Sequence, residues 1–146
     1  EQYKIENPAA WKFATLSPLE GAQVAAEGMA RPALLCGVSN TDVHQVQPHA
    51  IAITQASEYG LSYRPQELAV LGEFARARGL GLHMDGARFA TAAAFLCGSA
   101  AKASGPVDTL SFGCIKNGGM SAEAVVLFDP AQADLVKYRR KRGGHL

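Results

Sequence analysis

The fold class is decided by residues 50–85, which begin with Ala50-Ile51-Ala52-Ile53-Thr54 and end with Leu80-Gly81-Leu82-His83-Met84-Asp85. Both runs are short and apolar, which is typical of buried strands. Between them, Pro65 stands at a favourable first helical position, and four apolar residues then fall on one helical face. These four are Leu68, Leu71, Phe74 and Ala75. Gly79 follows as a left-handed cap, so the pattern predicts a strand–helix–strand unit.

The same alternation continues toward the C-terminus. Residues 87–97 are expected to form a helix, 107–112 a third strand and 122–128 a fourth. Asp129 and Pro130 are typical of an N-cap and a first helical turn, and the helix that follows is expected to run to about Arg142. Strands that alternate with helices predict an α/β fold with a mostly parallel sheet flanked by helices.

The first third of the chain is less orderly. Prolines interrupt residues 1–48, and only Ala22 to Met29 is weakly helical. We therefore expect a poorly defined N-terminal part over 1–48 and an α/β portion over 49–146. No glycine-, serine- or threonine-rich phosphate loop followed by a helix is legible in residues 1–48. The chain begins at Glu1 and stops in a Gly-Gly loop before Leu146, which we interpret as an internal or truncated piece of a longer protein.

Composition excludes several classes of function. The chain has 146 residues with a net charge of 14 − 13 = +1, so neither nucleic acid nor an anionic membrane is an expected partner. The longest apolar stretch, residues 89–101, is shorter than the ~20 residues of a membrane helix. The 3 cysteines contain no C-x-x-C pair, which favours a reducing cytosol over a disulfide framework. The histidines lack ligand spacing, so no metal is expected.

Polar residues follow three of the predicted strands. They occur at Thr54-Gln55, at Asp85 to Arg88 and at Gly113 to Lys116. Ligands of open α/β sheets bind at the carboxyl ends of the strands. Asp85 and Lys116 are 116 − 85 = 31 positions apart, about one βαβ unit, which spans ~30 residues. Their side chains are therefore expected to converge at neighbouring strand ends.

Two interpretations of this carboxylate and amine are open. One is a structural ion pair at the edge of the sheet. The other is a cofactor site, because a lysine amine forms a Schiff base with an aldehyde. A buried carboxylate can hold a pyridine nitrogen protonated, which turns the ring into an electron sink.

Longer motifs around these residues carry a family resemblance. They are His83 to Phe89, Asp108 to Gly118, Ile53 to Gly60 and Tyr138 to Arg142. In this order and spacing, the chain from about Val43 to Leu146 resembles low-specificity threonine aldolases. These are fold type I, pyridoxal 5'-phosphate (PLP) dependent enzymes grouped with the β-eliminating lyases.

The resemblance implies a fold, an activity and a set of site residues. The chain would be the central part of the large, aspartate aminotransferase-like PLP-binding domain, with the small C-terminal domain absent. Lys116 would carry PLP as a Schiff base, Asp85 would pair with its pyridine nitrogen, and Arg88 would reach its phenolic oxygen or the substrate carboxylate. A homodimer or homotetramer would cleave L-threonine and other β-hydroxy-α-amino acids to glycine and an aldehyde. A β-eliminating lyase and a catalytically incompetent fragment are the alternatives.

Three details remain open within that resemblance. His83 shares a strand face with Asp85 and either orients this carboxylate or is a structural histidine. The basic run Arg139 to Arg142 is either a solvated helix end or, in such dimers, a segment near the phosphate of the neighbouring subunit. Ile115 stands where the family often has a hydroxyl residue next to the lysine, and Cys114 stands where glycine is usual.

Overall fold

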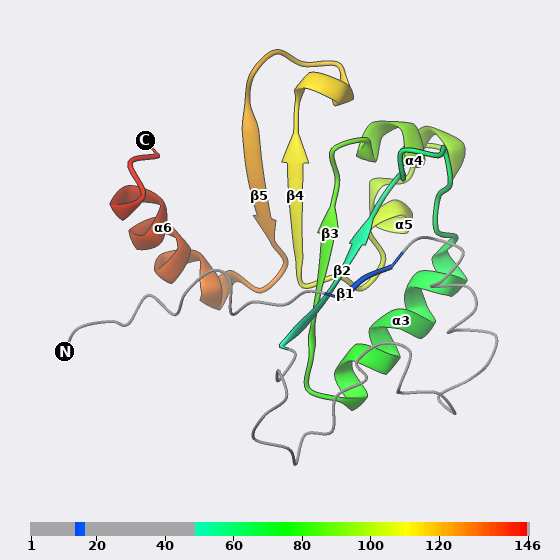
Figure 1. The fold of residues 1–146 in the computed structure, drawn as a ribbon, viewed down its shortest axis with the longest axis horizontal. Helices are drawn as coiled ribbons and strands as arrows, with labels where there is room; N and C mark the ends of the chain where they lie inside the picture. Colours follow the sequence, from blue (N-terminus) through cyan, green and yellow to red (C-terminus); the bar gives the residue numbers. More distant parts are fainter. Residues whose placement is uncertain (1–13, 17–48, 146) are drawn as a thin grey trace.

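The structure is a computed structural model that describes residues 14–16 and 49–145 (Figure 1). Within these residues, one five-stranded sheet has the order β1-β2-β3-β4-β5. The strands are β1 (Ala14–Leu16), β2 (Ala50–Thr54), β3 (Gly81–Asp85), β4 (Thr109–Gly113) and β5 (Glu123–Leu127). The first four are parallel, and β5 pairs antiparallel with β4. The predicted mostly parallel α/β sheet is therefore confirmed.

Helices connect and follow the strands. They are α3 (Pro65–Ala77), α4 (Phe89–Phe95), α5 (Ala100–Ser104) and α6 (Ala133–Arg142), with the 3₁₀ turns η3 (Ile115–Asn117) and η4 (Pro130–Gln132). All four predicted strands and all three predicted helices are present. Strand β1 and helix α5 were not predicted, and the expected helix at 22–29 lies outside the described residues. Ser99 caps the start of helix α5, since its Oγ accepts the Lys102 N–H at 3.2 Å.

Helix α3 begins and ends where its sequence predicts. Pro65 is its first residue, and the Arg64 N–H donates to Glu67 Oε2 at 2.7 Å. Gly79, with φ of +65°, takes the left-handed conformation beyond the last turn. The apolar face predicted for this helix is buried, including Leu68 and Leu71. The chain then returns directly into β3 beside β2.

The hydrophobic core lies between one face of the sheet and the helices α3, α4 and α5. Alternate strand residues supply it, such as Ile51 and Ile53 from β2 and Leu82 and Met84 from β3. The intervening residues of these strands are half-buried or exposed and lie on the opposite face. This alternation leaves His83 and Asp85 together on the face that the core does not use.

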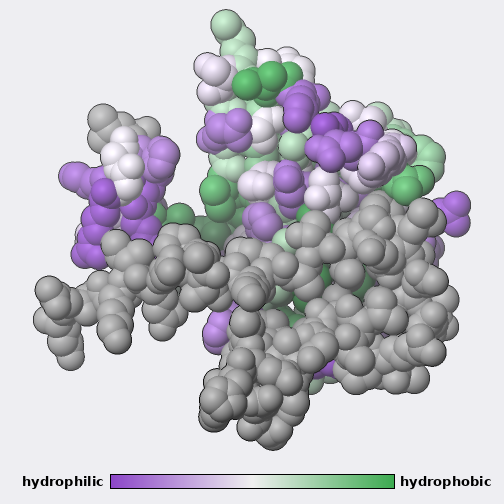
Figure 2. Space-filling view, in the orientation of Figure 1, coloured by the Kyte–Doolittle hydropathy of each residue, from purple (hydrophilic) through white to green (hydrophobic). Residues whose placement is uncertain are grey.

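The C-terminal part differs from the rest. Strand β5 is exposed along most of its length, and α6 has no buried residue. Figure 1 shows α6 beyond β5, away from α3, α4 and α5, and Figure 2 shows hydrophilic residues gathered over α6. No helix in the described ranges combines the length and apolar character needed to cross a membrane.

Candidate active site

The candidate site lies at the carboxyl ends of β2, β3 and β4. The register aligns Thr54 of β2 with Asp85 of β3, and Asp85 with Ser111 of β4. Because these strands are parallel, the segments that follow them emerge at one edge of the sheet. The predicted site segments 85–88 and 113–116 are therefore neighbours in space at this edge.

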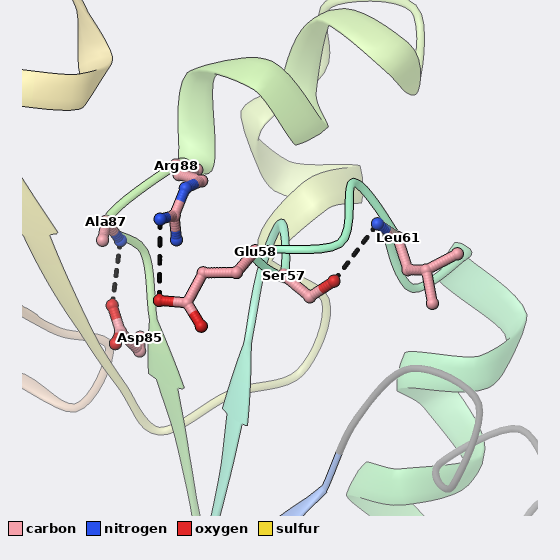
Figure 3. Close-up of polar contacts among 6 residues, drawn as sticks. All are labelled: Ser57, Glu58, Leu61, Asp85, Ala87 and Arg88. Atoms are coloured by element: carbon pink, nitrogen blue, oxygen red, sulfur yellow. Dashed lines mark hydrogen bonds and ion pairs between the residues drawn. The ribbon is translucent and has the colours of Figure 1, made fainter.

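The turn after β3 presents Asp85 and is packed tightly against β4. Asp85 is exposed, and its Oδ1 accepts the Ala87 N–H at 2.9 Å (Figure 3). The Gly86 N–H donates to the Ser111 carbonyl at 2.8 Å. A Cβ at position 86 would lie 2.6 Å from a Leu110 side-chain carbon and 2.7 Å from that carbonyl oxygen. Only glycine lets the turn approach β4 this closely.

Arg88 is oriented by an acidic residue from the segment after β2. Its guanidinium lies 3.6 Å from Glu58 Oε1, with side-chain exposures of 28% and 76% (Figure 3). The Glu58 segment is folded back on itself, since Ser57 Oγ and the Ser57 N–H both hydrogen-bond to the backbone of Leu61. An ion pair this exposed contributes little to stability.

Lys116 lies in η3, directly after β4, and its side chain is exposed. Its placement at the strand end next to that of Asp85 agrees with the sequence prediction. Within the described part of the chain, no hydrogen bond or ion pair joins Lys116 to Asp85. The structural ion pair between these two residues, one of the two interpretations of the sequence, is therefore not present among the described contacts.

Asn117 connects the segment after β3 with the segment after β4. The sequence did not predict this role. Its Oδ1 accepts the Ala90 N–H at 2.8 Å. Its Nδ2 donates to the Gly86 carbonyl at 3.0 Å and to the Gly113 carbonyl at 2.7 Å. The only sequence signal was an amide side chain directly after the lysine in a glycine-rich turn.

His83 lies two residues before Asp85 on the same face of β3. Its Nδ1 is 2.7 Å from Thr109 Oγ1 on β4. Partial burial lowers the pKa of His83 below its ordinary value, and the nearby Asp85 charge opposes this in part. The structure thus gives His83 a structural contact with Thr109 and an electrostatic one with Asp85, so both interpretations of this residue remain open.

Gln55, at the end of β2, does not face the candidate site. Its side chain is fully buried and donates to the carbonyls of Tyr63 and Ala103 at 3.1 and 3.2 Å. Its Oε1 accepts the Tyr63 N–H at 2.8 Å. Of the three strand ends that the sequence predicted to carry site residues, the end of β2 therefore places Gln55 in the core and not at the candidate site.

The functional groups at this edge are the amine of Lys116, the carboxylate of Asp85 and the guanidinium of Arg88. An amine fits an aldehyde, a carboxylate fits a protonated ring nitrogen, and a guanidinium fits an anionic oxygen. PLP carries all three of these groups, so the residues fit this cofactor. Asp85 is exposed in this structure, however, and not buried as the cofactor interpretation of the sequence expected. Among the residues that the structure describes, no group of three or more His, Cys, Asp or Glu is arranged to hold a metal ion.

The fold and these side chains define an α/β protein with a candidate ligand-binding edge at the ends of parallel strands. The chain belongs to the beta-eliminating lyase family, whose family model matches residues 8–146. The family resemblance drawn from the sequence is thereby confirmed.

Relatives and solved structures agree with this assignment. The chain is 44% identical over 107 residues to the low specificity L-threonine aldolase of Pseudomonas aeruginosa, covering 72% of this chain and 31% of that protein. The Leishmania major threonine aldolase structure has a TM-score of 0.55 and 26% identity, over 85% of this chain and 34% of its own. A structure from Exiguobacterium sp. 255-15, assigned as an aromatic amino acid beta-eliminating lyase/threonine aldolase, has a TM-score of 0.63.

The Exiguobacterium comparison covers 94% of this chain and 42% of the other at 20% identity, and it bears on the fold alone. The predicted fold class, that of fold type I enzymes, is confirmed by these structural neighbours. The chain spans about a third of the length of the curated relative, 31%.

Proposed function

We propose that this chain provides the PLP-binding edge of a carbon–carbon lyase that cleaves L-threonine and related β-hydroxy-α-amino acids to glycine and an aldehyde. The observation that carries the proposal is the position of Asp85 and Lys116 at the carboxyl ends of adjacent parallel strands. Membership of the beta-eliminating lyase family and the names of the relatives support the substrate class.

Each site residue has a separate task in this proposal. The Lys116 amine binds the aldehyde carbon of PLP, and the Asp85 carboxylate keeps a proton on the pyridine nitrogen. Arg88 donates to the phenolic oxygen or to the substrate carboxylate, and Glu58 directs its guanidinium. When bound, PLP supplies an electron sink for the electron pair left on the substrate Cα.

A β-elimination reaction is the second candidate. It is supported by the family name and by the name of the Exiguobacterium structure, and it would use the same residues. Threonine, serine and phenylserine distinguish the two reactions. An aldolase releases acetaldehyde, formaldehyde and benzaldehyde with glycine, whereas β-elimination of serine releases pyruvate and ammonia.

We also propose a domain organisation and an oligomeric assembly for the protein. Residues 49–146 form the PLP-binding portion, and a small C-terminal domain outside this sequence closes the substrate site. The protein works in the cytosol as a homodimer or homotetramer, without nucleic acid or membrane. Residues 139–142 are exposed at the end of α6, and both interpretations of this basic run stay open: a solvated helix end, or a segment near the phosphate of a neighbouring subunit.

Covalent trapping tests the proposed cofactor site. We expect borohydride reduction with PLP to fix the cofactor mass on the peptide that contains Lys116. Lys102 and Lys137, both in described helices, are internal controls and should carry little label. Lys116→Ala should remove the selective label, and an even distribution over the lysines would contradict the proposal.

A further inference from the structure

We propose that Asn117 is the positioning residue that fixes the Lys116 turn against the Asp85 turn. This inference rests on the proposed function, because it concerns how the two PLP-binding residues are held relative to each other. Asn117 follows Lys116 directly in η3, and Gly86 follows Asp85 directly after β3. One hydrogen bond, from Asn117 Nδ2 to the Gly86 carbonyl, therefore links the immediate neighbours of both residues.

Both N–H donors and the oxygen of the Asn117 amide take part in a three-point attachment. The Gly113 carbonyl ties it to the end of β4, the Gly86 carbonyl ties it to the turn after β3, and the Ala90 N–H ties it to the start of α4. The Ala90 N–H belongs to the first turn of α4, where backbone donors have no partner within the helix. Asn117 thereby satisfies three backbone groups from three segments.

The chemistry of the attachment requires a primary amide at this reach. The two carbonyls need a side chain with two N–H donors, and the Ala90 N–H needs a side chain with an acceptor oxygen. Asparagine offers both. Aspartate has nearly the same shape and keeps the acceptor for the Ala90 N–H but offers no donor when ionised. Leucine has a similarly branched but larger side chain and loses all three bonds.

The backbone of the lysine turn is closed by hydrogen bonds of its own. Gly118 has φ of +87°, and the Gly119 N–H returns to the Cys114 carbonyl at 2.8 Å. These local bonds shape the turn but do not attach it to β3. The interactions of Asn117 with Gly86 and Ala90 supply that attachment, at sequence separations of 31 and 27.

The test compares Asn117→Asp and Asn117→Leu with the unaltered full chain. Gln66→Leu is the matched control, because this exposed amide lies on α3. The first readout is the initial rate of PLP labelling at Lys116 under borohydride, divided by the rate at Lys102 in the same sample. We expect this ratio to fall roughly tenfold in both Asn117 variants, as for the loss of two or more hydrogen bonds, and to stay unchanged in Gln66→Leu.

The labelling ratio separates positioning from a merely structural role. If both variants lose thermal stability but keep the labelling ratio, Asn117 is only structural and the inference is wrong. If the unaltered chain labels Lys116 selectively and the variants do so equally well, the inference fails while the proposed function stands. If the unaltered chain shows no preference for Lys116, the proposed function fails, and this inference fails with it.

Hydrogen exchange on the unaltered chain provides a second measurement that does not depend on the variants folding. PLP binding at Lys116 should slow exchange of the Ala90 N–H, because ordering the lysine turn strengthens its bond to Asn117 Oδ1. The amides in the middle of α3 should exchange at the same rate with and without PLP. Unchanged exchange at Ala90, while Lys116 is labelled, would overturn the inference.

Discussion

Asp85 combines a structural contact and an exposed charge in a single side chain. One oxygen accepts the Ala87 N–H, and the residue stands open at the end of β3. These two properties can be separated by substitution, because asparagine keeps an acceptor oxygen and removes the charge.

Substitutions at Asp85 are expected to affect catalysis and stability differently. Asp85→Asn should leave thermal stability nearly unchanged and lower the rate of threonine cleavage by the complete enzyme at saturating PLP by ~100-fold, a loss of the size seen when a charge-stabilising group is removed. Asp85→Ala should also lose about 1 kcal/mol of stability with the turn contact. Asp85→Glu should retain more activity than Asp85→Ala. An unchanged rate in Asp85→Asn at saturating PLP would show that the carboxylate is only structural.

The lowered pKa of His83 predicts a pH dependence of stability. Burial in the fold disfavours the protonated ring, so the unfolded chain binds more protons near its ordinary pKa of 6.5. The stabilisation is complete above that pH and is lost as the pH falls below it toward the lower folded-state pKa. Urea midpoints should therefore decrease between pH 7.5 and 5.5, and less so in His83→Gln. Gln66→Leu, at an exposed position of α3, should keep the full dependence; an equal slope in His83→Gln would contradict the assignment.

At the scale of elements, Gln55 joins the end of β2 to the segment before α3 and to α5. Its amide meets backbone groups of Tyr63 and Ala103 inside the core. Gln55→Leu would remove all three of these hydrogen bonds from the core, at a cost of about 0.5–1.5 kcal/mol for each. We expect a loss of at least about 2 kcal/mol in urea unfolding. Gln66→Leu on the exposed face of α3 should change the unfolding free energy by less than ~0.5 kcal/mol.

The elements themselves were largely predictable, because their signals are local. Apolar runs marked β2 and β3, and Pro65 and Gly79 bounded α3 and its cap. Apolar periodicity predicted the strand at 122–128 but does not reveal strand direction, so the antiparallel direction of β5 was not predicted. The short connection after β4 contained that information, since a parallel pair needs a longer crossover.

The bridging side chains were not predictable from local patterns. Gln55 meets Ala103 across 48 positions, and Asn117 meets Gly86 across 31. Neither residue repeats with the period of a helix or strand. The sequence therefore indicated where Asp85 and Lys116 lie along the sheet edge, but not what holds their turns together.

At the scale of the whole molecule, apolar side chains remain exposed on β5 and α6. They include Val125 on β5, and Leu135 and Tyr138 on α6; Phe128, directly after β5, is exposed as well. We expect this chain to self-associate with rising concentration, because exposed strands and apolar side chains favour intermolecular contact. Val125→Lys should weaken the association measured by sedimentation equilibrium, whereas Val70→Lys on α3 should not. A chain that stays monomeric at the highest soluble concentration would contradict this expectation.

The antiparallel pairing of β4 and β5 bears on the order of folding events. The two strands and the Lys116 turn between them form a hairpin of low contact order, and hairpins close within about 1–10 μs. The pairing of β4 with β3, in contrast, spans the crossover through α4 and α5. On a growing polypeptide, the lysine turn can thus take shape by itself after β5 has been synthesised. Docking of this finished hairpin onto β3 would then unite the two halves of the site in one step.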